Sequence, residues 1–445
     1  MSSSVDVLVI GGGVAGIVAA IAARSAGAQV RLAEAGPQWM RGGNTRHARN
    51  LRLAHDGPDA RMPGAYGAED LLADMRRVAG GDIDEALAQA LACGAGSIGD
   101  WLAANGVRFL TPGRGVAPLS HRTAFFLGGG RAAVSALYAT AARIGVDVAY
   151  DTEVRGLEFE GGRIVSAELA GCGAAERVAP ATVIACAGGH QANRSWLREI
   201  YGPGADSIVV RGSPYVTGHV LRALIDAGAR TAGDPASAHF VAVDGRGPAS
   251  DGGIVTRIEC IPYGIVVDVN GARFADEGAD LRRTHYARWG ERLLEAPRAM
   301  AFSILDADGL ARAPSSGLAP VQAESLEDLA TALGLPPARL TETVSRYNDS
   351  LPSPDELAHA RPLASPPFFG YPLRPGITFT RYGVAVDPAM RVRRAGDGVY
   401  DNLFAAGMIM AATILPRAYL AGLGVTLSAA FGRMAGEEAA RHACR

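Results

Sequence analysis

A glycine-rich turn follows the first apolar run of the chain. Gly11, Gly13 and Gly16 have the G-x-G-x-x-G spacing, and residues 5–10 before them are apolar and β-branched. Gly11 permits a tight turn, Gly13 lets the backbone approach a pyrophosphate, and Gly16 allows close helix packing. Glu34 ends a second short apolar run, where its carboxylate can accept hydrogen bonds from ribose hydroxyls. The pattern predicts a dinucleotide site, and the spacing alone does not separate FAD from NAD.

The remaining chemistry-bearing residues exclude several classes of protein. All 43 basic residues are arginine, which excludes a P-loop lysine and a Schiff-base lysine. The cysteines lack C-x-x-C spacing, so we predict neither a disulfide framework nor a metal site; they are Cys93, Cys172, Cys186, Cys260 and Cys444. The net charge of -2 has no basic stripe, and no apolar run approaches the ~20 residues of a membrane span. We therefore expect no nucleic-acid partner, no membrane insertion and, without a secretory signal pattern, a cytoplasmic location.

The elements that must position the turn alternate between strands and helices. Short apolar runs predict strands at 5–10, 29–33, 146–148, 164–169, 181–186 and 402–407. The pattern predicts helices at 15–26, 68–105 and 134–143, and at 422–440 a turn followed by an Ala-rich helix. The first strand, turn, helix and second strand form a βαβ unit with the glycine turn at the helix N-terminus.

The length of 445 residues exceeds the size at which one hydrophobic core keeps growing, so two domains are expected. The strand at 181–186 runs into Ala187, Gly188 and Gly189, where the chain returns to the nucleotide domain. We predict a dinucleotide-binding domain over 1–236 and 379–445, with a second domain inserted at 237–378.

Four segments together resemble the fumarate reductase and succinate dehydrogenase flavoprotein family. They are residues 42–45 (GGNT), 187–189 (AGG), 270–277 (NGARFADE) and 432–440 (GRMAGEEAA). Residues 41–52 and 263–268 are most similar to the tricarballylate dehydrogenase branch. The flavoprotein half of an aerobic precorrin-3B synthase is also similar, and the resemblance covers nearly the whole chain.

The resemblance implies an α/β fold, in which a Rossmann-like FAD-binding domain of the glutathione reductase type carries an inserted α+β capping domain. Closure of such a cap excludes water from hydride transfer. Membrane-complex members of the family link FAD covalently to a histidine, and Asn44 occupies that position here. The resemblance therefore implies noncovalent FAD. His47 has the wrong register for the linkage but can still face the flavin or the substrate.

The resemblance also implies where each half of FAD lies. The adenosine half is expected at the first glycine turn, at Glu34 and at backbone near Val154, and the isoalloxazine near Asn44 and the turn 422–426. The predicted cofactor-binding residues are Gly11, Gly13, Val14, Ala15, Gly16, Glu34, Ala35, Arg41, Gly42, Gly43, Asn44, Thr45, Val154, Ala187, Gly188, Gly189, Glu277, Gly407, Met408, Gly424 and Val425.

Hydride transfer beside a carboxylate requires a group that exchanges a proton and cations that hold the carboxylate oxygens. In soluble fumarate reductases an arginine after an R-F-x-x-E stretch donates the proton. Here Arg273 to Glu277 has that pattern, and Arg282 follows one residue later than in those enzymes. The resemblance implies that Arg282 transfers the proton, with Asp280 or Glu277 assisting because arginine is a poor base.

Other positions depart from the family. Its relay glutamate falls at Arg257, its substrate-binding histidine at Phe379 and its carboxylate-binding arginine at Tyr419, so fumarate is not the expected substrate. Arg417 is the candidate replacement for that arginine, and His239 matches a histidine that begins the cap. The predicted catalytic residues are Arg282, His239, Arg417, Tyr419 and His47. Each has a structural alternative: a solvated arginine, a core histidine or a packing tyrosine.

The leading hypothesis is an FAD-dependent oxidoreductase that transfers a hydride between flavin N5 and a carbon–carbon bond of a small carboxylated substrate. An electron donor or acceptor must complete the cycle, and the sequence does not identify it. Two alternatives stay open at this point. One is an oxygen-using monooxygenase or oxidase, and the other is a non-catalytic flavin-binding subunit.

Overall fold

The computed structural model describes residues 3–111, 120–171, 173, 175–278, 285–351 and 360–444. The chain forms two compact units. Unit 1 comprises residues 1–193, 215–238 and 379–445, and unit 2 comprises residues 194–214 and 239–378. We predicted residues 194–214 to be part of the first domain, but they belong to unit 2. One reason is that Val209 and Val210 in this segment pair in parallel with Gly376 and Ile377.

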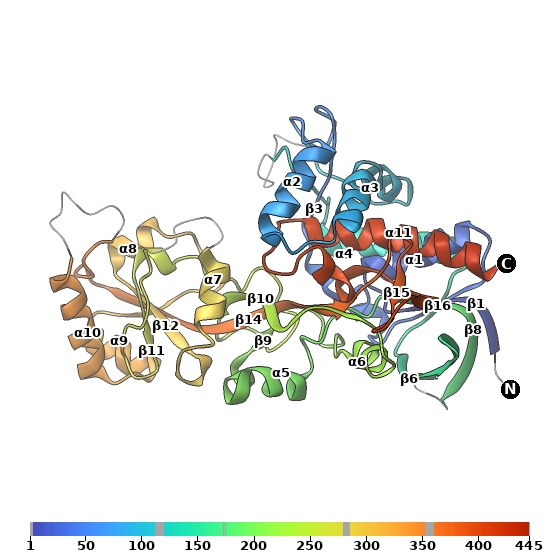
Figure 1. The fold of residues 1–445 in the computed structure, drawn as a ribbon. Coiled ribbons are helices and arrows are strands. Elements are labelled where there is room, and N and C mark those ends of the chain that lie inside the picture. The colour runs from blue at the N-terminus through green and yellow to red at the C-terminus, as the bar shows by residue number, and fades with distance from the viewer. Residues whose placement is uncertain are drawn as a thin grey trace. The chain divides into compact units, whose positions relative to one another are not determined.

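Unit 1 is built on an eight-stranded sheet with the order β15-β16-β8-β1-β2-β5, extended by β7 on β8 and β6 on β7 (Figure 1). The strands are β1 (Ser3–Ile10), β2 (Val30–Ala33), β5 (Asp147–Ala149), β6 (Glu153–Glu160), β7 (Arg163–Ala170), β8 (Glu176–Ala185), β15 (Arg391–Arg393) and β16 (Val399–Ala405). The apolar end of β1, Val7 to Ile10, is buried between its parallel neighbours β2 and β8. A strand in this position needs apolar side chains on both faces. A separate pair joins β3 (Asn50–Arg52) and β4 (Thr123–Phe125).

Two helices of unit 1 pack closely through glycine. A Cβ on Gly432 or Gly436 of α11 (Leu423–Ala443) would lie only 2.4 or 2.3 Å from the carbonyl oxygens of Ala15 and Ala19 in α1 (Val14–Ser25). The other helices are α2 (Ala68–Ala79), α3 (Glu85–Ala104), α4 (Gly129–Arg143), α6 (His219–Asp226), and the 3-10 turns η1 (Gln38–Met40), η2 (Gly43–His47), η7 (Gly407–Ile409) and η8 (Ala411–Thr413). None of the helices in the described part of the chain is long and apolar enough to cross a membrane.

The predicted strands and helices of this unit are largely confirmed, with one correction. The single helix expected over 68–105 is two helices, α2 and α3. Gly80 and Gly81 separate them with φ angles of +67° and +94°, which end α2 in the left-handed region that glycine adopts freely. A turn at 160–163 joins β6 to β7, and β6 is a strand that the sequence analysis did not identify.

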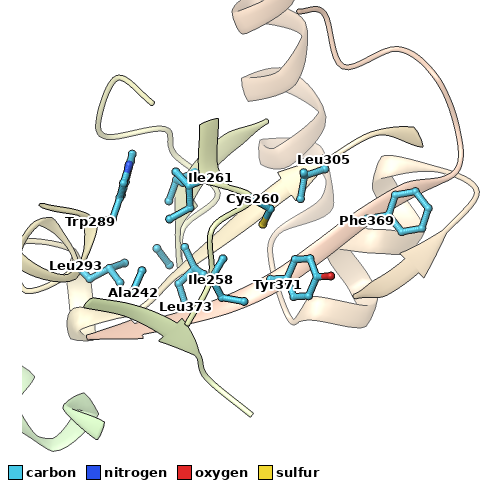
Figure 2. Close-up of a cluster of buried hydrophobic side chains, with 12 residues drawn as sticks. Ala242, Ile258, Cys260, Ile261, Trp289, Leu293, Leu305, Phe369, Tyr371 and Leu373 are labelled. Atoms are coloured by element: carbon cyan, nitrogen blue, oxygen red, sulfur yellow. The ribbon is translucent and has the colours of Figure 1, made fainter. Parts of the chain in front are cut away.

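The second sheet has the order β10-β14-β12-β11, with β9 and β13 also on β14. Its strands are β9 (Val209–Val210), β10 (Thr231–Asp244), β11 (Ile265–Asp268), β12 (Ala301–Leu305), β13 (Val321–Ala323) and β14 (Phe368–Val384), and the chain passes between the units within β10 and β14. Helices of unit 2 are α5 (Arg194–Tyr201), α7 (His285–Arg292), α8 (Ala307–Arg312), α9 (Leu326–Leu333), α10 (Pro337–Asp349), and the 3-10 turns η3 (Gly202–Ser207), η4 (Ile261–Tyr263) and η5 (Pro297–Ala299). Figure 2 shows part of its core, a cluster of buried side chains that includes Trp289, Leu293, Cys260, Tyr371 and Leu373.

Candidate functional site

The first glycine turn leaves β1 at Ile10 and enters α1 at Val14, and two of its glycines are required by the protein itself. Gly11 has a φ of +97°, and a Cβ there would lie 2.7 Å from the carbonyl oxygen of Cys186. A Cβ on Gly16 would lie 1.8 Å from the Gly11 carbonyl oxygen. As predicted, the lack of a side chain at Gly11 allows the tight turn, and its lack at Gly16 allows the helix to approach the strand closely.

Gly13 differs, because no protein atom fills the space that its side chain would take. A Cβ there meets only the Gly42 carbonyl oxygen at 3.9 Å, and a Cβ on Gly43 meets only the Gly13 Cα at 3.7 Å. Gly13 is the N-cap of α1 and has no side chain to accept from the first N–H groups of the helix. The Val14 N–H donates to Thr45 Oγ1 over 3.2 Å. The result is a bare backbone cradle at a helix N-terminus, which fits a pyrophosphate. We call Gly13, Val14, Gly43 and Thr45 the phosphate cradle.

Glu34 lies immediately after β2 with its carboxylate turned back to the glycine turn. Its Oε2 accepts from the Gly12 N–H at 2.9 Å, and its Oε1 accepts from the Gly36 N–H at 2.8 Å. Burial raises the pKa of Glu34, although backbone hydrogen bonds oppose that shift. Each carboxylate oxygen can accept a further hydrogen bond, so this position suits a ribose hydroxyl.

Tyr138 of α4 braces the same turn, and the sequence analysis missed it. Its hydroxyl donates to the Gly12 carbonyl oxygen over 2.9 Å. A Cβ on Gly12 would lie 2.0 Å from that hydroxyl and 2.5 Å from Glu34 Oε2. Burial raises the pKa of Tyr138, so the phenol stays a neutral donor. The Arg41 guanidinium lies 4.9 Å from the centre of the Tyr138 ring. The sequence around Tyr138, an Ala-rich helix, does not indicate this contact, so the residue could not be predicted from it.

A cavity of about 300 Å³ lies beside Glu34, at the positions expected for the adenosine half. Ala35, Asp151, Glu153, Arg155, Tyr215 and Thr217 contribute to its walls. The Thr152 N–H donates to the Glu34 carbonyl oxygen over 2.9 Å, and this bond joins the start of β6 to the end of β2. Val154, the predicted adenine neighbour, is buried in β6 between two of the lining residues.

The second predicted flavin turn precedes α11 and is held by side chains. Arg52 on β3 donates from its backbone N–H to Thr426 Oγ1 over 2.9 Å and from Nε to the Ala421 carbonyl oxygen over 3.0 Å. Gly422 has a φ of +81°, and a Cβ there would lie 2.9 Å from the Arg52 nitrogen. Arg52 is buried and also bonds to Tyr66 and Asp74. This arginine was not predicted as a site residue.

Several predicted residues meet at this second turn. A Cβ on Gly424 would lie 3.6 Å from the Tyr419 ring and 3.7 Å from Met408 Sδ. Gly407, with a φ of +83°, is adjacent to α1, since a Cβ there would lie 2.6 Å from the Ala15 Cβ. The structure thus brings Gly407, Met408, Tyr419 and Gly424 together within unit 1.

The part of β14 in unit 1 adds residues to this neighbourhood. Phe379 packs on Tyr419 with ring centres 5.4 Å apart, and Arg381 shares its face of the strand because side chains alternate. Arg381 is buried, and its Nη1 donates to Ser237 Oγ over 3.1 Å. The sequence analysis missed Arg381, although its place two residues after Phe379 in an alternating strand could have indicated it.

The opposite face of β14 contacts the predicted 187–189 segment. A Cβ on Gly189 would lie 2.0 Å from Thr380 Oγ1, which accepts from the His190 N–H over 3.3 Å. The His190 ring lies edge-on to Tyr382 at 6.3 Å. Burial and the nearby Arg222 lower the pKa of His190 to about 4, so the imidazole is neutral near neutral pH.

Other predicted catalytic residues are more dispersed. The Arg417 side chain is 64% exposed and forms an ion pair with Asp82 over 3.1 Å, which it would have to leave to hold a substrate. His47 is partly buried on η2, and His239 is buried in unit 2. Arg282 and its assisting residue Asp280 lie outside the described residues.

Glu277 is the one predicted cofactor residue that belongs to unit 2. Its Oε1 accepts from the Val266 N–H over 2.6 Å, and its Oε2 accepts from Arg273 Nε over 2.9 Å. Burial raises its pKa against the influence of Arg273. These bonds give Glu277 a role within unit 2, and its contact with the cofactor stays a prediction.

Comparison with known proteins agrees with this site. Residues 6–425 match a family model described as FAD binding domain. A fumarate reductase (cytochrome) of Shewanella frigidimarina is 27% identical over 459 aligned positions, covering 99% of this chain and 77% of that protein. An NADH:acrylate oxidoreductase of Vibrio harveyi is 26% identical over 306 positions, covering 65% of this chain and 30% of that protein.

Solved structures share the fold. The open conformation of a flavocytochrome c3 fumarate reductase superposes with a TM-score of 0.81 at 23% identity, covering 100% of this chain and 79% of that one. A 3-ketosteroid delta1-dehydrogenase from Sterolibacterium denitrificans gives 0.78 at 17% identity, covering 99% of this chain and 100% of that one. The predicted fold class, a Rossmann-like domain with a capping domain, is confirmed.

Proposed function

Because the chain belongs to the family described as FAD binding domain and is an FAD-dependent oxidoreductase, we propose that it transfers a hydride to or from a carbon–carbon bond of a small carboxylated substrate. The predictions of FAD and of an oxidoreductase are confirmed by the comparisons. The observation that supports cofactor binding most directly is the phosphate cradle, where, among the described residues, a Cβ on Gly13 would meet only the Gly42 carbonyl oxygen at 3.9 Å. A fumarate reductase and an acrylate oxidoreductase among the relatives support a carboxylated substrate.

Bound FAD supplies a hydride acceptor or donor at N5. The residues of this chain hold it: the N-terminus of α1 binds the pyrophosphate, and Glu34 binds the ribose. Asn44 replaces the histidine that would form a covalent link, and its amide cannot take that role. We expect acid precipitation to release the flavin into the supernatant, and flavin that stayed with the polypeptide would contradict noncovalent binding.

The buried arginine on β14 is the best-placed carboxylate ligand within unit 1. Arg381 lies on the face of β14 that contacts Tyr419, which in turn contacts the Gly424 turn. A guanidinium binds a carboxylate through two parallel hydrogen bonds. Proton transfer is assigned to the predicted residues, with Arg282 first and His239, Tyr419 and His47 next.

The reaction is tested under anaerobic conditions with a panel of di- and tricarboxylates. We expect a saturated member, tricarballylate or a related acid, to bleach the oxidised flavin, or its unsaturated counterpart to reoxidise the reduced flavin. Arg381→Met should raise KM by about tenfold or more, while the matched variant Arg417→Met changes it less. No response across the panel, with fast reoxidation by air, would favour the oxygen-using alternative. The electron partner and the cytoplasmic location stay predictions.

A further inference from the structure

A second cavity of unit 1, of about 440 Å³, lies beside the loop that follows β2. Its walls come from this loop and from α4, and they include Trp39, Arg41, Arg46, Arg131 and Ser135. Its volume falls within the roughly 300–1,000 Å³ that small-molecule sites occupy. We call it the arginine cavity.

The arginine cavity lies on a different face of the loop from the phosphate cradle. Gly43 faces Gly13, since its Cβ would lie 3.7 Å from the Gly13 Cα. A Cβ on Gly42 would instead lie 2.7 Å from a methyl group of Val134, which lines the arginine cavity. The loop therefore lies between the arginine cavity and the place where the FAD pyrophosphate fits. Arg41, which the sequence analysis predicted to bind FAD, lines the arginine cavity, and its contact with FAD stays a prediction.

The arginine cavity is strongly cationic. Three of its seven lining residues are arginine, against 43 of 445 in the chain, and none of the seven is acidic. Arg41 is held in place by the Tyr138 ring and by the Tyr150 hydroxyl, 3.4 Å from Nη1. Arg46 is buried, with Nη1 at 2.9 Å from Met40 Sδ. A cavity lined by positively charged groups attracts anions.

One wall of the arginine cavity is an exposed aromatic ring. Trp39 is 76% exposed, which is unusual for so large an apolar side chain. An indole face beside arginines can stack a planar ring, while guanidinium groups bind phosphate oxygens in pairs. We propose that the arginine cavity binds a phosphorylated aromatic ligand of the nucleotide class, in addition to FAD. This goes beyond the proposed reaction and does not depend on its substrate.

The test titrates the FAD-loaded protein with ADP, adenosine and inorganic phosphate in a calorimeter. ADP should bind once per chain without releasing flavin, and adenosine and phosphate should each bind more weakly. Arg131→Ala and Trp39→Ala should weaken ADP binding by about tenfold or more, with the FAD content unchanged. Arg143→Ala is the matched control, because it removes the same charge from an exposed position in the last turn of α4. It should leave ADP binding unaltered.

Four results would overturn the proposal. ADP could fail to bind the FAD-loaded protein, or it could bind equally well to all the variants. ADP could release flavin, which would place its binding in the dinucleotide site. If inorganic phosphate bound as tightly as ADP, the arginine cavity would be a general anion site that does not recognise the aromatic ring of the ligand. Failure of the carboxylate panel would affect none of these readouts, so the two proposals fail separately.

Discussion

Two glycine turns open the helices α1 and α11, which pack on each other, and the two turns are stabilised differently. Main-chain hydrogen bonds hold the two sides of the turn before α1, where the Gly11 N–H donates to Ala33 and the Cys186 N–H donates to Ile10, each over 2.8 Å. Glu34 and Tyr138 hold its inner residue, Gly12, and leave Gly13 uncovered. Its outer surface at Gly13 is bare backbone. The turn before α11 is held by Arg52 of β3, whose Nε donates to the Ala421 carbonyl oxygen and whose main-chain N–H donates to Thr426 Oγ1 on α11.

This difference separates binding from stability. A bare backbone can approach a ligand closely, so a side chain added to the first turn should act mainly on the cofactor. A buried, multiply bonded arginine supports the second turn, so its loss should act mainly on folding. The predictions that follow test this division, beginning with the largest effect.

Gly13→Val should abolish FAD binding while the chain still folds. The added side chain occupies the phosphate cradle, yet its Cβ meets no protein atom closer than 3.9 Å. Flavin absorbance per chain after gel filtration measures binding, and circular dichroism measures folding. Gly57→Val is the control, because a Cβ there has open space and no ligand is expected. Stoichiometric flavin in Gly13→Val would place the pyrophosphate elsewhere.

Arg52→Met should lower the free energy of unfolding by about 3 kcal/mol, because it breaks a buried ion pair with Asp74 and the bond to Ala421. Urea unfolding measures the loss. Arg77→Met removes a second partner of the same Asp74 from an exposed position, with 63% of the Arg77 side chain exposed, so about 1 kcal/mol or less is expected. Equal losses in the two variants would show that Arg52 does not hold the second turn.

Spacing predicted the first turn and the family resemblance implied the second, but the sequence did not identify the arginine that holds the second turn. Strand, glycines, helix and Glu34 lie within 34 residues, and each has a local signal in spacing or periodicity. Arg52 bonds to a residue 374 positions away, and Tyr138 bonds to one 126 positions away. Contacts of that range depend on how the elements pack, which no local pattern records. The same limit explains why residues 194–214 were predicted to belong to the first domain although they lie in unit 2. Arg381 is different, because its alternation with Phe379 along one strand is a local signal.

Tyr138→Phe should weaken the first turn modestly, by about 1 kcal/mol, since one buried hydrogen bond to the Gly12 carbonyl is lost. The ring, which the Arg41 guanidinium contacts, remains. Urea unfolding and the FAD dissociation constant are both measured, and the dissociation constant should rise by less than tenfold. If Phe left both values unchanged, Tyr138 would fill space without bracing the turn.

The smallest effect concerns pH and should have opposite signs at the two turns. The pKa of Glu34 is raised from 4.5 because of burial, so its stabilising contribution is present below the unfolded pKa and is lost as pH rises through the folded value. Burial also acts to raise the pKa of Asp74, but Arg77, Tyr66 and Arg52 lower it from 3.8, so its contribution is present at neutral pH and is lost on acidification. In flavin-free protein taken from neutral pH to pH about 2, Asp74→Asn should therefore lose less stability than the unsubstituted chain, and Glu34→Gln should lose more. Unfolding free energies over that range supply the test, and a shift of the same sign in both variants would show that the two turns do not differ in their electrostatics.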